Sequence, residues 1–266
     1  MQPSRPARSS LCQQILAHCV EAVAASQQQR DPFPHIQVRE FFPSEIYQRL
    51  LEQLPEPHQY HGLNYGTPLA PGEKAVRYRF MFNGQGMQRL DDERRELWTA
   101  VRDALAAPEL KAAVFSRLSA GLAFRFGVSE EQAREVAAYP LPELFRETSG
   151  YAIKPHPDTR RKVVTMQIAL PRDESQAELG TEFYKLSLNP LHLLREPRGF
   201  VTVKRMPFVP NAAYAFTVLN TLTLRSWHGR TMLTTQSGVR NSILNIWYAN
   251  TDEVYPEILA QYGKAA

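Results

Sequence analysis

Two side chains that can hold a proton or a metal stand two residues apart in the stretch GYAIKPHPDTRRKVVTMQIALP, residues 150–171. They are His156 and Asp158, with Pro157 between them. A β-branched run follows, so an extended backbone is expected here, and residues i and i+2 of a strand point to the same face. The pair can therefore share a proton or coordinate a metal ion. A third ligand elsewhere in the chain would favour the metal.

His228 is the best candidate for that third ligand. It lies in NTLTLRSWHGRTML, at the end of a strand-like run and directly before Gly229. The 72 residues that separate it from His156 leave room for several intervening strands of a closed sheet. The other histidines fall in an expected helix, strand start, loop or turn, and they are His18, His35, His58, His61 and His192.

A cationic side chain and a hydroxyl open the next expected strand, RNSILNIWY. Arg240 and Ser242 are again two residues apart, so they share a face of that strand. A guanidinium binds a carboxylate through two parallel, charge-assisted hydrogen bonds, and a hydroxyl can add a third. This pair therefore suits an anionic ligand.

Taken in order, these three motifs resemble the iron(II)/2-oxoglutarate-dependent dioxygenases, and most closely their prolyl-4-hydroxylase-like branch. The resemblance covers residues 148–250, and more loosely residues 30–55, where HIQVREFFPSEIYQRLLEQL is similar to the strand-then-helix opening of that branch. It implies that three residues are catalytic and bind Fe(II): His156, Asp158 and His228. It also implies 2-oxoglutarate as cosubstrate, held by Arg240 and Ser242, and dioxygen as oxidant. The alternative is that His156 and Asp158 only hydrogen-bond each other near a turn, with Arg240 an ordinary surface residue.

The same resemblance implies a reaction: hydroxylation of an unactivated C–H bond, with release of succinate and CO2. Halogenating relatives lack the carboxylate ligand, so the presence of Asp158 favours hydroxylation. Thr165 and Gln167 are further candidates for cosubstrate contacts if their face of the expected strand 163–170 looks inward. An outward orientation is the open alternative, because strand register is poorly fixed by sequence.

The elements around these motifs predict an α+β fold. Short β-branched or aromatic segments, separated by Pro, Gly or Asn, indicate strands at 139–147, 150–156, 162–170, 180–188, 199–206, 212–219, 223–228 and 239–249. Such a series is typical of a sandwich or jelly roll, and the resemblance implies a double-stranded β-helix. Helices are expected at 9–29, from an N-cap at Ser44, and over 91–120 with a break near Pro108. We therefore expect one domain over 1–266, with mainly helical support and a substrate loop in 1–138 and the jelly-roll core in 139–250.

The composition of the chain limits the classes of partner that are expected to bind it. The chain is 43% hydrophobic and 22% charged, with a net charge of +4 and scattered basic residues. No run of 18 apolar residues occurs, so neither a membrane nor a nucleic-acid partner is expected, and a cytoplasmic location is the default. Oligomeric state is left open.

The substrate is expected to be a small molecule, namely an amino acid or secondary metabolite, free or carrier-bound. Its contacts are expected in the loop 57–74 and the strand 75–82, with four candidates: Tyr60, Tyr65, Arg77 and Arg79. A protein prolyl or other side-chain hydroxylase is the alternative. A non-oxidative metal-binding β-barrel is disfavoured, because it has no need of a carboxylate anchor such as Arg240.

Overall fold

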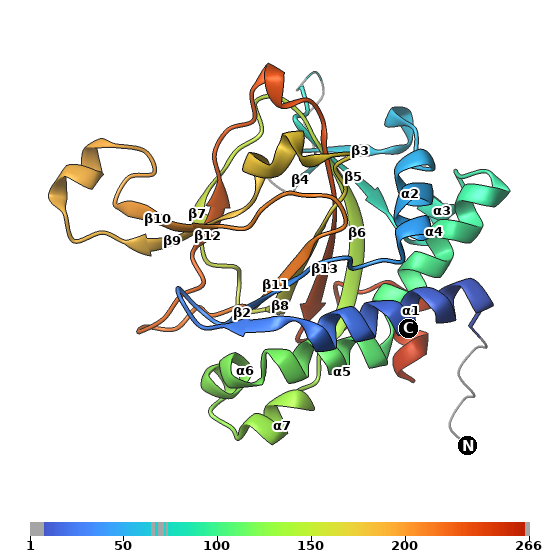
Figure 1. Ribbon diagram of the computed structural model, residues 1–266, viewed down its shortest axis with the longest axis horizontal. Coiled ribbons are helices and arrows are strands. Elements are labelled where there is room, and N and C mark those ends of the chain that lie inside the picture. Colours follow the sequence, from blue (N-terminus) through green and yellow to red (C-terminus); the bar gives the residue numbers. More distant parts are fainter. Residues whose placement is uncertain (1–7, 65–66, 69–71, 73, 264–266) are drawn as a thin grey trace.

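The computed structural model of the chain describes residues 8–64, 67–68, 72 and 74–263. Within this part of the chain, two antiparallel sheets face each other, as Figure 1 shows. The larger sheet contains, in spatial order, β1 (Gln27–Gln29), β2 (His35–Val38), β11 (Ala213–Thr217), β8 (Lys162–Ala169), β13 (Arg240–Tyr248), β6 (Tyr139–Glu147), β5 (Arg77–Met81), β3 (His61–Asn64) and β4 (Thr67–Pro68). The smaller sheet contains β10 (Phe200–Arg205), β9 (Glu182–Leu186), β12 (His228–Arg230) and β7 (Ile153–His156).

Helices cover the outer face of the larger sheet. They are α1 (Ser10–Ala25), α2 (Ser44–Glu52), α3 (Gly84–Met87), α4 (Asp92–Leu105), α5 (Pro108–Arg117), α6 (Ser119–Phe126), α7 (Glu130–Arg134) and α8 (Pro256–Leu259). The helix α1 buries Ile15, Cys19 and Val23, which recur every four residues and so form one face. These side chains belong to the same apolar core as Met166 of β8 and Trp247 of β13. Packing against the helices therefore fixes which face of each central strand looks outward.

Most predicted elements are confirmed to within a few residues, and three differ. The expected strand 223–228 begins only at His228, as β12. Ser44 is the first helical residue rather than the N-cap, a position that Pro43 occupies without a side-chain bond. The mainly helical first half also supplies β1 to β5, which extend the larger sheet at both edges, and β5 lies within the strand expected at 75–82. The expected long loop 57–74 accordingly contains β3 and β4.

The strand β8 shows how the sequence directs polar side chains inward. Val164, Met166 and Ile168 alternate along it and join the core under the helices. Thr165 and Gln167 occupy the opposite face and line a cavity between the two sheets. Both polar residues are buried, so they need hydrogen-bond partners inside that cavity. The inward orientation proposed for Thr165 and Gln167 is thus the one observed.

Aromatic side chains fill the space between the sheets beside this cavity. Phe183 of β9 and Phe216 of β11 lie 5.8 Å apart, centroid to centroid, with their rings edge to face. Phe33 packs on both of them. The ring of Phe216 also lies 4.7 Å from that of His228. This apolar layer fixes the position of His228 from one side.

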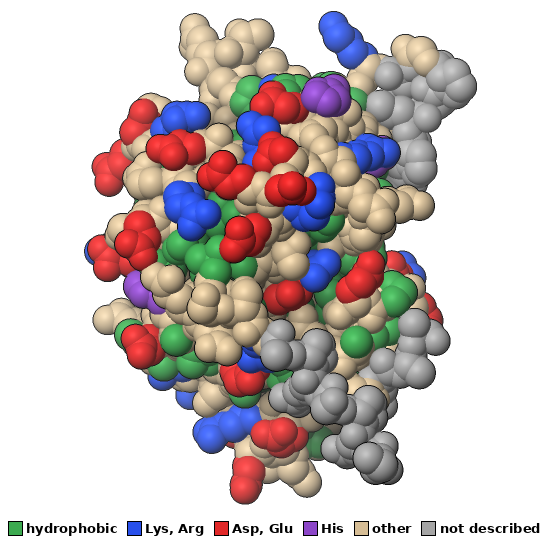
Figure 2. Space-filling model, turned by 90° about the vertical axis from the view of Figure 1, so that its right-hand side faces the viewer, with side chains coloured by type: hydrophobic (Ala, Val, Ile, Leu, Met, Phe, Trp, Pro, Cys, Tyr) green, Lys and Arg blue, Asp and Glu red, His purple; other side chains and the backbone are tan. Residues whose placement is uncertain are grey.

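The surface carries charges of both signs. Figure 2 shows acidic and basic side chains interspersed over the face turned to the viewer, without a single-sign stripe. Among the described residues, no helix is both long enough and apolar enough to cross a membrane.

Candidate active site

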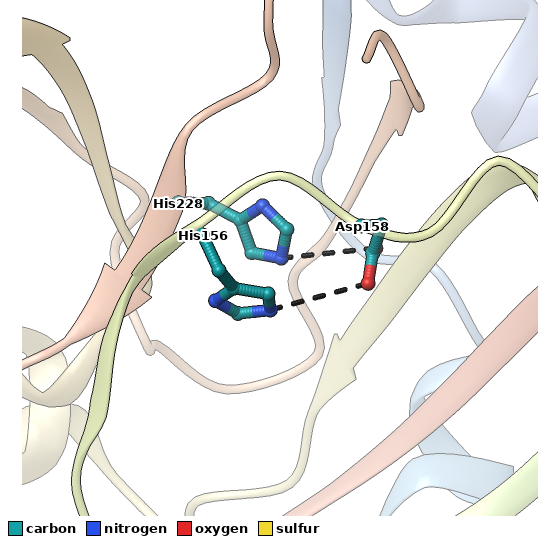
Figure 3. Close-up of side chains that lie close together, drawn as sticks. All are labelled: His156, Asp158 and His228. Atoms are coloured by element: carbon teal, nitrogen blue, oxygen red, sulfur yellow. Dashed lines mark ion pairs between the residues drawn. The ribbon is translucent and has the colours of Figure 1, made fainter.

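Neighbouring strands of the smaller sheet bring His156, Asp158 and His228 together. The two histidines are directly opposite each other in the antiparallel pair of β7 and β12, with ring centroids 4.4 Å apart. Asp158 follows β7 and turns its carboxylate toward both rings, as Figure 3 shows. One oxygen, Oδ1, lies 4.0 Å from Nε2 of His156, and Oδ2 lies 3.7 Å from Nε2 of His228. Both distances exceed hydrogen-bond range, so neither histidine is hydrogen-bonded to the Asp158 carboxylate.

The other ring nitrogen of each histidine is already occupied. Nδ1 of His156 lies 2.9 Å from the carbonyl oxygen of Lys154, and Nδ1 of His228 lies 2.9 Å from that of Ser226. A carbonyl only accepts, so each Nδ1 carries the proton and each Nε2 presents a lone pair. Metal-binding histidines are commonly oriented in this way, by a hydrogen bond from the nitrogen that does not coordinate.

Electrostatics keeps His228 and Asp158 in the protonation state that binds metal. Burial lowers the pKa of His228 to about 4, so its imidazole is neutral near pH 7. Burial alone would raise the pKa of Asp158, but the charge of Lys162 and the hydrogen bonds from Lys162 and Thr165 outweigh it and hold that pKa well below its usual value. These bonds are 2.5 Å from Lys162 Nζ to Oδ1 and 2.7 Å from Thr165 Oγ1 to Oδ2.

These residues fit divalent iron. The ligand atoms of the three side chains all lie within 4.8 Å of one another, and they comprise two imidazole nitrogens and one carboxylate oxygen. Two histidines and one carboxylate on one face of an octahedron leave three open positions, which is the arrangement typical of non-haem Fe(II) oxygenases. His156 is the ligand nearest to solvent, with 35% of its side chain exposed against 4% for Asp158. The metal would therefore sit near the mouth of the cavity.

Gly229, which follows His228, allows β12 and β7 to approach each other closely. A Cβ atom at this position would lie 2.6 Å from the carbonyl oxygen of Ile153 in β7. Real Cβ atoms do not approach backbone oxygens so closely, so any other residue would push β12 away from β7. The glycine thus permits the strand contact that brings His228 beside His156.

Arg240 lies deep in the same cavity rather than on the surface, with 1% of its side chain exposed. Strand register places Arg77 of β5, Glu147 of β6 and Arg240 of β13 in one row across three adjacent strands. Nη1 of Arg240 donates to Oε2 of Glu147 at 2.7 Å, and its Nε donates to the carbonyl of Leu179 at 3.0 Å. Burial, followed by the nearby charge of Arg230, lowers the pKa of Arg240 to about 10, which leaves it charged near neutral pH.

A hydrogen-bond network extends from Arg240 to the predicted cosubstrate contacts. Nη2 of Arg240 donates to Oε1 of Gln167 at 2.8 Å, and the amide of Gln167 lies 3.3 Å from Oγ of Ser242. Oε1 of Gln167 also accepts bonds from Tyr214 and Thr181. Thr165 stands apart from this network, because its hydroxyl is bonded to the carboxylate of Asp158.

Glu147 is not among the site residues predicted from the sequence, and neither are Lys162, Thr181 and Tyr214. Glu147 is 2% exposed and contacts three arginines, and burial would raise its pKa, but the charges of Arg230, Arg240 and Arg77 lower it to about 2. The sequence feature that could have indicated Glu147 is a charged residue at the end of an apolar strand segment. Its partners depended on strand order, which the sequence leaves open.

The candidate substrate contacts are only partly in the cavity. Arg77 lines it, together with the metal ligands and Arg240, around a space of about 100 Å³. Tyr60 is buried in the apolar core instead, and Arg79 pairs with Glu143 at 3.4 Å. Tyr65 lies outside the described residues.

Comparisons with known proteins bear on the fold. No protein-family model matches the chain, and no curated protein sequence does. Among solved structures, the chain is similar to a prolyl hydroxylase from Trichoplax adhaerens in complex with a peptide fragment of hypoxia inducible factor, at 12% identity and a TM-score of 0.51, over 90% of this chain and 89% of that one. A Pseudomonas putida prolyl-4-hydroxylase matches at 14% identity and a TM-score of 0.46, over 88% and 98% of the two chains.

A third solved structure, the non-heme alpha ketoglutarate dependent epimerase SnoN from nogalamycin biosynthesis, matches at 12% identity and a TM-score of 0.44, over 87% and 81%. At 12% identity, the match to the Trichoplax adhaerens prolyl hydroxylase shows the fold alone. The resemblance seen in the sequence is thereby confirmed for the fold: the chain has the jelly-roll fold of the iron(II)/2-oxoglutarate-dependent oxygenases, similar to that of a prolyl hydroxylase.

Proposed function

We propose that this protein is an iron(II)- and 2-oxoglutarate-dependent oxygenase that hydroxylates an unactivated C–H bond of a small molecule and releases succinate and CO2. The observation that carries the proposal is the shared cavity. The triad His156, Asp158 and His228 lines it together with the buried guanidinium of Arg240. A metal site alone does not need a buried cation beside it, whereas a cosubstrate with a far carboxylate does.

Each protein group has a defined task in this proposal. The Nε2 atoms of His156 and His228 and the carboxylate of Asp158 would hold Fe(II), which in this fold family activates dioxygen with 2-oxoglutarate as reductant. Thr165 fixes the orientation of Asp158 through the bond to Oδ2. Arg240, held by Gln167 and the Leu179 carbonyl, would pair with the far carboxylate of the cosubstrate.

Ser242 and Gln167 would complete the cosubstrate contacts. Both lie on inward faces of adjacent strands, where Ser242 is fully buried and Gln167 is 7% exposed. Leu244 and Ile246, on the same face of β13 as Ser242, add apolar walls to the cavity. Such walls exclude water and strengthen the interactions of charged groups inside.

Metal content and cosubstrate binding test the proposal together. His156→Ala, Asp158→Ala and His228→Ala should each lower bound Fe(II) from one per chain to well below one, and each should abolish 2-oxoglutarate-dependent succinate formation. His58→Ala removes an exposed histidine that is distant in sequence from all three ligands, and it is the matched control. Full iron content and activity in the His228 variant would refute the triad, and circular dichroism shows whether each variant is folded.

Hydroxylation of a protein side chain is the second candidate function. The hairpin that joins β9 to β10 projects beside the smaller sheet, as Figure 1 shows, and carries exposed apolar side chains, Leu188, Leu191 and Leu194 among them. An exposed apolar arm next to the metal-binding strands suits an extended peptide better than a small metabolite. Oxidation of proline-containing peptides, without oxidation of free amino acids or metabolites, would favour this candidate.

A further inference from the structure

Three arginines surround one glutamate at the inner end of the cavity, and we call this group the arginine cluster: Arg77, Arg230, Arg240 and Glu147. Oε2 of Glu147 lies 2.7 Å from Nη2 of Arg230 and 2.7 Å from Nη1 of Arg240. Its other oxygen, Oε1, lies 3.3 Å from Nε of Arg77. The exposed fractions of the four side chains range from 1% for Arg240 to 15% for Arg77. All four residues line the same cavity as the metal ligands.

The charges within the arginine cluster do not balance. Three guanidinium groups face one carboxylate, which leaves two positive charges without a counter-ion inside the cluster. The far carboxylate of a bound 2-oxoglutarate would offset one of them. A buried charge without a partner is costly, so the remaining cation indicates a second anionic group.

Arg230 has a side-chain nitrogen without a partner in the described part of the chain, whereas each nitrogen of Arg240 has one, which leaves part of the five N–H donors of Arg240 for a ligand. All three nitrogens of Arg240 donate to protein groups, on Glu147, Gln167 and the Leu179 carbonyl. Arg230 is 5% exposed, yet its Nη1 has no hydrogen-bond partner among the residues that the structure describes. Because an unsatisfied buried donor destabilises a protein, a ligand atom is the natural partner for this nitrogen.

Aromatic rings restrict the orientation of the two less engaged guanidinium groups. The ring of Tyr151 lies 4.7 Å from the guanidinium carbon of Arg230 and 5.2 Å from that of Arg77. Phe145 lies 4.2 Å from the guanidinium carbon of Arg77. Stacking of this kind holds the planar groups in place without using their N–H donors.

The position of Arg230 suits a ligand that also reaches the metal. Arg230 is two residues beyond His228 in β12, and both side chains line the same cavity. One two-residue step along a strand is about 7 Å. An anionic group on Arg230 therefore lies within one small molecule's length of the metal site.

We propose that Arg230, assisted by Arg77, binds a carboxylate of the substrate, separately from the cosubstrate carboxylate on Arg240. This inference rests on the proposed function and narrows its substrate class to small molecules with a free carboxylate. An amino acid with a free α-carboxylate fits, whereas one linked to a carrier or a peptide through that carboxyl does not. The planar guanidinium of Arg230 matches a carboxylate through two parallel N–H donors.

Acetate is a sufficient probe, with acetamide as its neutral counterpart of the same size. The protein is loaded with Fe(II) under anaerobic conditions and saturated with 2-oxoglutarate, whose binding is measured first by calorimetry. Acetate is then titrated, and its binding is followed by the relaxation of its methyl protons near the bound iron. We expect acetate to bind and acetamide not to bind. Arg230→Gln should weaken acetate binding at least ten-fold while changing the 2-oxoglutarate Kd less than three-fold.

The matched control is Arg79→Gln, which removes an arginine from the strand that carries Arg77 but outside the cavity lining. This variant should change the binding of neither acetate nor 2-oxoglutarate. Arg230→Lys keeps the charge and should retain part of the acetate binding, which separates loss of the site from loss of folding.

Three results would overturn the inference: no acetate binding to the 2-oxoglutarate-saturated wild type, acetate binding unchanged in Arg230→Gln, or a loss of 2-oxoglutarate binding in Arg230→Gln as large as in Arg240→Gln. Failure of the metal-loaded wild type to bind 2-oxoglutarate would instead refute the proposed function. In that case, acetate binding to the metal-loaded protein without 2-oxoglutarate tests whether Arg230 binds a carboxylate.

Discussion

Replacing Glu147 by glutamine should destabilise the protein and tighten its hold on the cosubstrate at the same time. The pKa of Glu147 is lowered from an ordinary 4.5 to about 2, because the charges of Arg230, Arg240 and Arg77 outweigh the cost of burial. Each pKa unit corresponds to about 1.4 kcal/mol, so the charged form contributes about 3 kcal/mol to the free energy of unfolding near pH 7. Removal of one partner from a buried ion pair typically costs about 3–5 kcal/mol, which agrees with this figure.

The same change should favour a bound dianion. Without the carboxylate of Glu147, three buried guanidinium groups lack their internal counter-ion, and a ligand carboxylate near Arg240 no longer has a negative neighbour. We expect the Kd for 2-oxoglutarate to fall about ten-fold, equivalent to about 1.4 kcal/mol. Because ligand that binds only the folded state stabilises it, saturating 2-oxoglutarate should raise stability more in the variant than in the wild type.

Urea unfolding with and without 2-oxoglutarate, together with calorimetric titration of the metal-loaded protein, measures both effects. Glu143→Gln is the matched control, since Glu143 is buried on the same strand but bonded to Tyr255 and Arg79 outside the cavity. Burial raises the pKa of Glu143, so its neutral replacement should cost less stability. Unchanged stability in Glu147→Gln, or weaker 2-oxoglutarate binding, would show that Glu147 does not serve as the internal counter-ion of the three arginines.

Further changes have equally definite outcomes. Arg240→Gln should weaken 2-oxoglutarate binding at least thirty-fold, equivalent to about 2 kcal/mol, with little change in Fe(II) affinity. Ser242→Ala should weaken 2-oxoglutarate binding more mildly. An unchanged 2-oxoglutarate Kd in Arg240→Gln would mean that another residue binds the cosubstrate carboxylate. The stability due to Glu147 is full above about pH 4.5 and is lost as pH falls toward 2, so the stability gap between wild type and Glu147→Gln should close over that range in acid titrations of unfolding. Lys162→Met removes the ammonium that occupies Oδ1 of Asp158, and metal titration should show Fe(II) binding several-fold tighter; weaker binding would mean that Lys162 serves to orient Asp158.

The elements that hold the site could largely be predicted because each carries a local signal. β-branched runs bounded by turn residues located β8 and β13 to within a residue or two. The i, i+2 rule placed His156 with Asp158, and the structure brings His228, the predicted third ligand, to the same site. Ser44 shows the limit of such signals, since helix ends shift by a residue when packing and a preceding proline compete with capping.

The partners inside the cavity could not be predicted, because they depend on strand order and register. Glu147 meets Arg240 only because β6 pairs with β13 in a register that sets these two residues opposite each other. Arg230 reaches the same carboxylate from the other sheet, across the barrel. The predicted strand 223–228 was wrong for a related reason. The strand β12 begins at His228 because pairing with β7 starts there, and the β-propensity of the preceding residues did not determine where the strand begins.

Labelled dioxygen shows whether the protein uses dioxygen to convert 2-oxoglutarate to succinate. The Fe(II)-loaded protein is incubated with 2-oxoglutarate under isotopically labelled dioxygen, with the His228→Ala variant alongside, and succinate is analysed by mass spectrometry. We expect the wild type to incorporate one labelled oxygen atom into succinate and the variant to form no succinate. Succinate without label, equal labelling in the variant, or no 2-oxoglutarate consumption by an iron-loaded wild type would contradict this expectation.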